Sequence, residues 1–238
     1  MRLTLIHIIK IKIIIISLLL IQPASAETKD IYLVFYATAN GKSGHVGIAV
    51  DNYKVIVKDT FDENNNRIAV YDTIKNGALS YYDLWPKTDD FNAFNVDKNV
   101  PAQYFKLPSA SWENDITIAS LIKTGLPHEE FYPVDGLLQI TSSVKEDLEI
   151  KKYIAALINK NQDFNVRDFN CADFVELIIE KQCHCDIKAD ESIVLQRSTT
   201  PNRIYQEVSK LKNIKIIKDA SEKAKGAFTS ERLLKRNQ

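Results

Sequence analysis

The residue types best suited to covalent chemistry gather at Asn170-Cys171-Ala172-Asp173. The side-chain oxygen of Asn170 can cap a helix, and Asp173 stands three residues later at the acidic position of a capping box. Cys171 is therefore expected at the first helical position, where free N–H groups and the helix dipole favour a thiolate. The stretch predicts a nucleophilic cysteine; a small buried cysteine that happens to begin a helix is the simpler alternative.

The chain has three cysteines, Cys171, Cys183 and Cys185. An odd number leaves at least one thiol unpaired within the chain. A helix from Cys171 to about Lys181 separates Cys171 from Cys183 by more than a disulfide can span, because each helical residue adds roughly 1.5 Å of rise. We therefore expect the free thiol to be Cys171. Cys183-His184-Cys185 could instead form a local disulfide, a redox pair or part of a metal site, but no second Cys/His cluster accompanies it.

A cysteine nucleophile needs a base within hydrogen-bonding reach. The histidines beyond the first 26 residues are His45, His128 and His184. His128 is expected in an exposed loop, and His184 in the loop after the cysteine helix. His45 opens a strand directly after Gly44, so a rigid element would hold its ring while the small neighbour leaves room for a substrate. Position and elimination favour His45 as the general base; a lone polar residue at the start of a strand is the alternative.

A third group usually orients the base. We expect His45 to lie in the first strand of a tight hairpin whose second strand, 53–61, carries Asp59. A three-residue turn places Asp59 opposite His45, whereas a two-residue turn places Lys58 there and turns Asp59 to the other face. Asp72, on the following strand, is the other candidate. Asp59 is slightly preferred, and both aspartates are equally compatible with a solvated position.

Strand-like segments dominate the first half of the chain and helical segments the second. The first part reads as an antiparallel meander, and one α+β domain over 27–218 is the economical interpretation. The expected strands cover 31–39, 45–50, 53–61, 67–74, 91–96, 103–107, 137–141 and 213–218. The expected helices cover 112–124, 144–160, 171–181 and a segment beginning at Thr200-Pro201, with a loop over 182–197.

Residues 1–26 have the pattern of a signal peptide. A basic start precedes an apolar core over 13–21, and Ala24-Ser25-Ala26 is a small-residue cleavage site. The apolar run is too short to be a confident membrane span. We therefore expect an exported protein, periplasmic or extracellular, without a stable transmembrane anchor. At the other end, 219–238 is expected to be a charged tail.

Overall charge gives no sign of a polyanionic partner. The chain has 31 basic and 31 acidic residues among 238, with 45% hydrophobic residues, which is typical of a globular protein. No basic stripe with interleaved aromatic residues is present, so nucleic acid is not an expected partner.

Two short motifs suggest a family. Gly44-His45-Val46-Gly47-Ile48 and, much later, Asn170-Cys171-Ala172-Asp173-Phe174 resemble the circularly permuted branch of the NlpC-type papain-like cysteine peptidases. That branch includes YiiX-like proteins and relatives of lecithin:retinol acyltransferase. The ordinary family has the cysteine helix first, and the order here is reversed. The family's third polar residue has no matching counterpart, because the corresponding count after His45 lands near Val57.

The resemblance implies a papain-like fold and cleavage of an amide or ester through an acyl-thioester, with no metal and no organic cofactor. Cys171 would attack the carbonyl, His45 would carry the proton, and the backbone N–H of Cys171 would meet the oxyanion. Export makes cell-wall (peptidoglycan-derived) peptides the expected substrate. The alternatives are a lipid acyl hydrolase or acyltransferase of the same fold, with Tyr81, Tyr82 and Trp85 lining an acyl groove, and a non-catalytic envelope binding protein.

Overall fold

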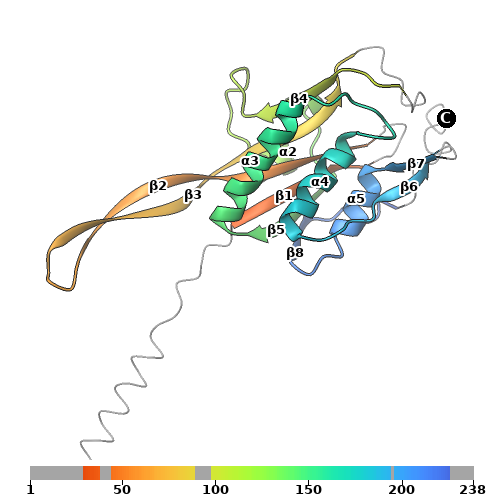
Figure 1. Ribbon diagram of the computed structural model, residues 1–238. Helices are drawn as coiled ribbons and strands as arrows, with labels where there is room; N and C mark the ends of the chain where they lie inside the picture. Colours follow the sequence, from red (N-terminus) through yellow and green to blue (C-terminus); the bar gives the residue numbers. More distant parts are fainter. Residues whose placement is uncertain (1–28, 38–43, 89–97, 194–195, 226–238) are drawn as a thin grey trace, which may run out of the picture.

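The computed structural model describes residues 29–37, 44–88, 98–193 and 196–225. Within these residues the chain forms an α+β structure with a six-stranded antiparallel sheet and four α-helices (Figure 1). The sheet order is β4-β3-β2-β1-β5-β8. Its strands are β1 (Lys29–Tyr36), β2 (His45–Phe61), β3 (Arg67–Pro86), β4 (Ala102–Leu107), β5 (Gly136–Ser142) and β8 (Ile214–Lys218). The helices are α2 (Ile118–Lys123), α3 (Val144–Lys160), α4 (Cys171–Cys183) and α5 (Pro201–Val208), with a 3₁₀ turn η1 (Pro127–Glu129).

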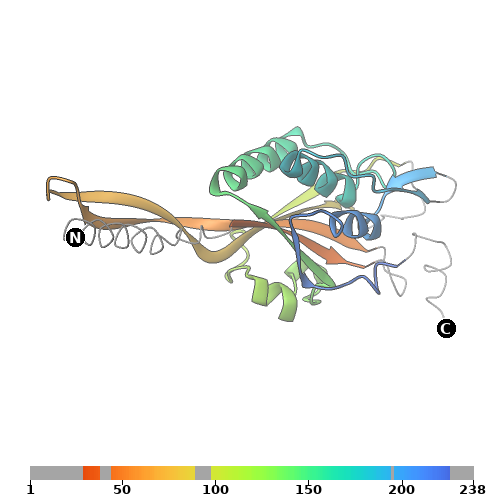
Figure 2. The ribbon, with the colours of Figure 1, turned by 90° about the horizontal axis from the view of Figure 1, so that it is seen from below.

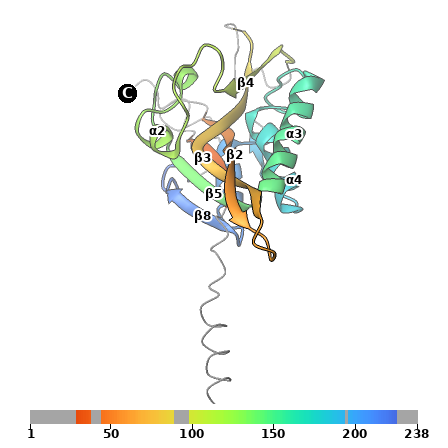
Figure 3. The same ribbon diagram turned by 90° about the vertical axis from the view of Figure 1, so that its left-hand side faces the viewer.

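Helices cover both faces of the sheet. Helices α3, α4 and α5 lie on one face, and α2 lies on the other (Figures 2 and 3). The two cores follow from the alternation of side chains in a strand: Ile31, Leu33 and Phe35 of β1 pack on the α3/α4/α5 side, and Tyr32 and Val34 on the α2 side. A strand buried on both faces needs an almost continuous apolar run, which is the pattern that 31–36 shows.

Strands β2 and β3 extend far beyond the sheet as a two-stranded ribbon (Figure 1). Strand β2 pairs with β1 only up to Val50, and its pairing with β3 continues from Tyr53 to Phe61 after a bulge at Asp51. The expected turn at Asp51-Asn52 is therefore wrong. The Asp51 side chain accepts a hydrogen bond from the backbone of Asp30 at 2.9 Å, and this long-range contact holds the bulge inside one continuous strand.

Three other expectations also need correction. The strand expected to end at residue 74 continues to Pro86 as β3, and it passes through Gly77 at a φ of +86°. The helix expected over 112–124 is confined to α2, because Thr117 forms its N-cap. The expected loop over 182–197 contains a small hairpin of β6 (Asp190–Ile193) and β7 (Gln196–Thr199).

Most of the remaining expectations are confirmed. α3 has the expected bounds, α4 begins at Cys171, and β4, β5, α5 and β8 form where the sequence indicates. The strand expected over 91–96 and the leader over 1–26 lie outside the described residues. So does most of the expected tail, although Ala220 and Ala224, at its beginning, are buried. Among the described helices, none is long and apolar enough to cross a membrane.

Candidate active site

The free thiol lies at the first residue of α4. Asn170 accepts hydrogen bonds from the N–H groups of Ala172 (2.7 Å) and Asp173 (3.3 Å), and Asp173 returns one to the N–H of Asn170 at 2.8 Å. This is the expected capping box. The cap engages the N–H groups of Ala172 and Asp173 rather than that of Cys171. The Cys171 N–H is thus placed to donate to a ligand at the positive end of the helix dipole.

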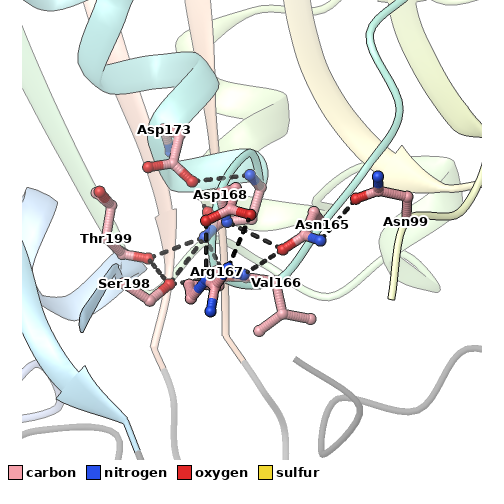
Figure 4. A network of polar contacts seen from close by, with 9 residues as sticks. Asn99, Asn165, Val166, Arg167, Asp168, Asp173, Ser198 and Thr199 are labelled. Atoms are coloured by element: carbon pink, nitrogen blue, oxygen red, sulfur yellow. Dashed lines mark hydrogen bonds and ion pairs between the residues drawn. The ribbon is translucent and has the colours of Figure 1, made fainter. Parts of the chain in front are cut away.

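A second layer of hydrogen bonds fixes the segment before α4 (Figure 4). The amide of Asn170 donates to the carbonyls of Val166 (2.8 Å) and Thr199 (3.0 Å), which ties the helix start to β7. Asn165 accepts from the backbone of Arg167 and Asp168 and donates to Asn99 at 2.7 Å. Asn165 and Asn170 are both almost fully buried. The position of Cys171 is therefore set by polar contacts from several separate segments.

Cys171 is confirmed as the free cysteine. Cys183 and Cys185 form a disulfide with each other at the far end of α4. His184, between them, is the exposed C-cap of that helix. A 13-residue helix separates His184 from the Cys171 end by roughly 20 Å. Neither His184 nor the disulfide therefore belongs to the site around Cys171.

His45 meets Asp83 at the sheet end closest to Cys171. The Nε2 atom of His45 lies 2.9 Å from Oδ2 of Asp83, and both side chains are almost completely buried. The hydroxyl of Tyr81 donates to the same oxygen at 2.6 Å. Trp85 stacks on the His45 ring with centroids 4.5 Å apart and shields that face of it from water.

The pairing of β2 with β3 explains this convergence. Ile48 pairs with Tyr82 and Ala49 with Tyr81. Continuing that register places Gly47 opposite Asp83, on the same face as His45. A Cβ on Gly47 would lie 2.2 Å from the Tyr81 hydroxyl, so only glycine leaves space for the tyrosine that holds the carboxylate.

Charge links His45 to the thiol. Burial lowers the pKa of His45, but interactions with Cys171 and with the Asp83 carboxylate together raise it well above its ordinary value. Cys171 contributes both by charge and by a hydrogen bond, so the two side chains lie close to each other. Because Nε2 of His45 faces Asp83, Nδ1 remains for the thiol. The arrangement places a thiol, an imidazole and a carboxylate beside one another, in that order.

Asp83 is a strong partner for a protonated His45. Burial raises its pKa, but the charges and hydrogen bonds of His45 and His128 outweigh burial and hold the pKa well below its ordinary value. The group therefore stays ionised in a fully buried position. A buried carboxylate is tolerated there because three donors converge on one of its oxygens.

The structure brings together Cys171 and His45 but neither of the expected third residues. Asp59 pairs with Arg67 near the ribbon tip, and Asp72 pairs with Lys58 at 2.7 Å. The expectation for Asp59 depended on a hairpin turn after His45, and that for Asp72 on a position in the strand that follows. Because β2 continues straight through that position, Asp59 and Asp72 lie out on the ribbon. Asp83 takes the place assigned to them.

Sequence reasoning missed Asp83 and His128. A usable signal was the alternation of Tyr81, Asp83 and Trp85, which places all three on one face of a strand. His128 is not exposed as expected: its Nε2 lies 2.7 Å from the Asp83 oxygen, and its ring stacks on Phe105 at 4.1 Å. Nothing in the local sequence of η1 indicates this position.

Three side chains in the site are of types that can bind a metal ion. His45, His128 and Glu129 present ligand atoms within 4.8 Å of one another. Both histidine Nε2 atoms, however, lie at hydrogen-bond distance from the same Asp83 oxygen. Two Nε2–H donors on a carboxylate explain this arrangement directly.

Comparison of the chain with protein-family models, with curated proteins and with solved structures finds no match in any of the three.

Proposed function

We propose that this protein is an exported thiol hydrolase of the permuted NlpC-type, papain-like kind, which cleaves an amide bond in cell-wall peptides. The observation that carries the proposal is the contact of His45 with both Cys171 and Asp83. A nucleophile, a base and an orienting carboxylate are the three parts that covalent acyl transfer needs. The order of the histidine strand and the cysteine helix agrees with the permuted family motif.

The chemistry follows from these positions. The Cys171 thiolate attacks the carbonyl carbon, and the backbone N–H of Cys171 donates to the developing oxyanion. The His45 imidazolium gives its proton to the leaving amine as the C–N bond breaks, which leaves a thioester. Neutral His45 then takes a proton from water as the water oxygen attacks the thioester carbonyl. The C–S bond breaks, which releases the carboxylic acid and restores the Cys171 thiolate beside the imidazolium. Asp83 holds the ring and stabilises its protonated form.

The alternatives lose part of their support. Tyr81 and Tyr82 are buried on opposite sides of the sheet, in separate cores, so they do not jointly line an acyl groove. A non-catalytic binding protein would not need Cys171 and His45 to lie close to each other, as they do here. Cell-wall peptides remain the proposed substrate because of the leader and the family motif.

The first test is the reactivity of Cys171 without any substrate. Iodoacetamide labelling of the protein, followed by mass spectrometry as a function of pH, should show a reactive plateau below the range in which a free thiol ionises, about pH 8.5. His45→Ala should remove the plateau. His184→Ala changes a histidine at the other end of α4 and serves as the matched control. A Cys171 that reacts as an ordinary thiol, equally in wild type and His45→Ala, would overturn the hydrolase proposal.

The second test is turnover. Purified cell-wall peptides should be cleaved by the wild type and not by Cys171→Ser, and His45→Ala should lose about 100-fold or more in rate. Acyl esters tested in parallel decide the substrate class. Cleavage of esters with no cleavage of peptides would replace the peptidase by a lipid acyl hydrolase.

A further inference from the structure

His128 is partly buried beside the site, although the reaction steps proposed above give it no task. Its Nε2 lies 2.7 Å from Oδ2 of Asp83, the same oxygen that His45 and Tyr81 contact. Two histidine rings therefore share one carboxylate oxygen. A carboxylate with three donors on one oxygen has little freedom to rotate.

The shared oxygen also fixes the tautomers. Each ring must present Nε2–H to the carboxylate, because Oδ2 of an ionised aspartate only accepts. For His45 this leaves Nδ1 as the atom that exchanges a proton with the thiol. His128 donates to the same oxygen as His45. Its presence therefore affects both the orientation of the Asp83 carboxylate and the strength of the hydrogen bond between that carboxylate and His45.

The chain segment around His128 adopts an uncommon backbone. Glu130 and Phe131, which follow η1, both have positive φ values, of 52° and 59°. Non-glycine residues seldom take this conformation, and two in a row are costly. Gly125, at the start of the segment, has a φ of +73°, and a Cβ there would lie 1.8 Å from the carbonyl oxygen of Tyr132. This tightly folded loop delivers His128 to Asp83.

We infer that His128 is a positioning residue: its Nε2–H holds Asp83 in the orientation in which the carboxylate aligns His45 with Cys171. The inference deepens the proposed thiol chemistry and depends on it. The hydrogen bond of His128 is made to Asp83, so its effect on His45 and Cys171 passes through that carboxylate.

Two substitutions separate the possible roles of His128. His128→Phe keeps an aromatic ring that can stack on Phe105 but removes the N–H donor. His128→Gln keeps an N–H donor near the position of Nε2 but removes the ring. Other titratable side chains lie around the carboxylate and His45, and their charges also act on the site. They are Tyr81 on β3, Tyr36 on β1, Glu129 on η1 and Cys171 on α4, in addition to Asp83 on β3 and His45 on β2.

The readout is the low-pH plateau of Cys171 alkylation, measured with thermal melting on the same full-length variants. We expect His128→Phe to lower the plateau by about tenfold, which is the effect of one unit of pKa. His128→Gln should stay within about twofold of wild type, on the same scale. Loss of packing alone would give the reverse order, with His128→Phe intact and His128→Gln impaired, and would overturn the inference.

The outcomes distinguish this inference from the proposed function. A wild type without a His45-dependent plateau overturns both. A wild-type plateau that persists in His128→Phe overturns only the role of His128. If His128→Phe fails to fold, His128→Gln decides: a folded glutamine variant with the plateau supports the inference, and a folded one without it overturns the inference.

Discussion

At the scale of single residues, the site depends on one charge that water does not reach. Asp83 is fully buried, and its pKa is held below the ordinary range mainly by the two histidines that it contacts, against the effect of burial. In an exposed pair such a contact would contribute little. Here the low polarity of the surroundings strengthens both the benefit of the pairing and the cost of disrupting it.

Asp83→Asn tests this charge without changing the size of the side chain. We expect Cys171 alkylation at low pH, and any turnover, to fall by about 100-fold or more, because an amide neither stabilises the imidazolium nor fixes its tautomer. Asp72→Asn, on the ribbon part of the same strand, is the matched control and should react like wild type. An Asp83→Asn protein with wild-type reactivity would show that His45 needs no carboxylate.

The raised pKa of His45 makes a prediction about stability. A group with a folded pKa above its unfolded value, near 6.5, adds stability that is complete below about pH 6.5 and is lost as pH rises through the folded pKa. The urea midpoint of wild type relative to His45→Gln should therefore decrease from pH 6 toward alkaline pH. His184→Gln should show no such trend. A constant difference between wild type and His45→Gln would contradict the charged pair.

At the scale of elements, the start of α4 decides where the Cys171 thiol lies. Asn170 both caps the helix and donates to the carbonyls of Val166 and Thr199. Asn170→Ala should lower the free energy of unfolding by about 2 kcal/mol, the upper end for loss of a helix cap. It should also reduce Cys171 reactivity, as measured by urea titration and alkylation.

Thr117→Ala is the control for this prediction. Thr117 forms the corresponding capping box at α2, on the other face of the sheet. Its loss should lower stability by about 1 kcal/mol and leave Cys171 alkylation unchanged. Equal effects of the two substitutions on alkylation would mean that the Asn170 network stabilises the protein without positioning the thiol.

The elements also show how far sequence reasoning reaches. Local signals were sufficient for α3 and for the capped start of α4, because Ser143 and Asn170 form capping boxes within their own segments. They failed at Asp51, where the polar pair resembles a turn. A long-range contact from the backbone of Asp30 instead keeps that position in a strand. A contact between residues that are distant in the sequence cannot be recognised from the local pattern of residue types.

The same limit applied to the site. Cys171 and His45 could be identified because each begins an element with a recognisable start. Asp83 could not, because its role depends on the register between β2 and β3, and a single bulge shifts that register. His128 reaches the site through a loop with uncommon backbone angles, which residue types alone do not reveal.

At the scale of the whole molecule, the ribbon of β2 and β3 stands apart from the covered sheet. Its exposed large apolar residues are Val55, Val57, Phe61, Ile68, Val70 and Tyr71. An isolated two-stranded ribbon is only marginally stable in water. Its base is nevertheless fixed, because Lys75 pairs with Asp30 and Asp51, and Lys151 donates to Asn52 at 2.6 Å.

Hydrogen exchange should resolve this difference. Backbone amides of 53–61 and 67–75 should exchange well before those of β1 and β5, because the ribbon gains little from tertiary packing. Mass spectrometry of peptic fragments at several times of exchange measures this directly. Protection of the ribbon equal to that of β1 would contradict a free ribbon and would indicate that another surface covers it.

The order of the site residues along the chain also has a consequence during synthesis. His45, Asp83 and His128 all leave the ribosome before Cys171 does. A nascent or prematurely ended chain would therefore contain the two histidines and the carboxylate but not Cys171. Under the proposed thiol chemistry, the last part of the site to be made is the one that forms the covalent bond, so an incomplete chain cannot react through Cys171.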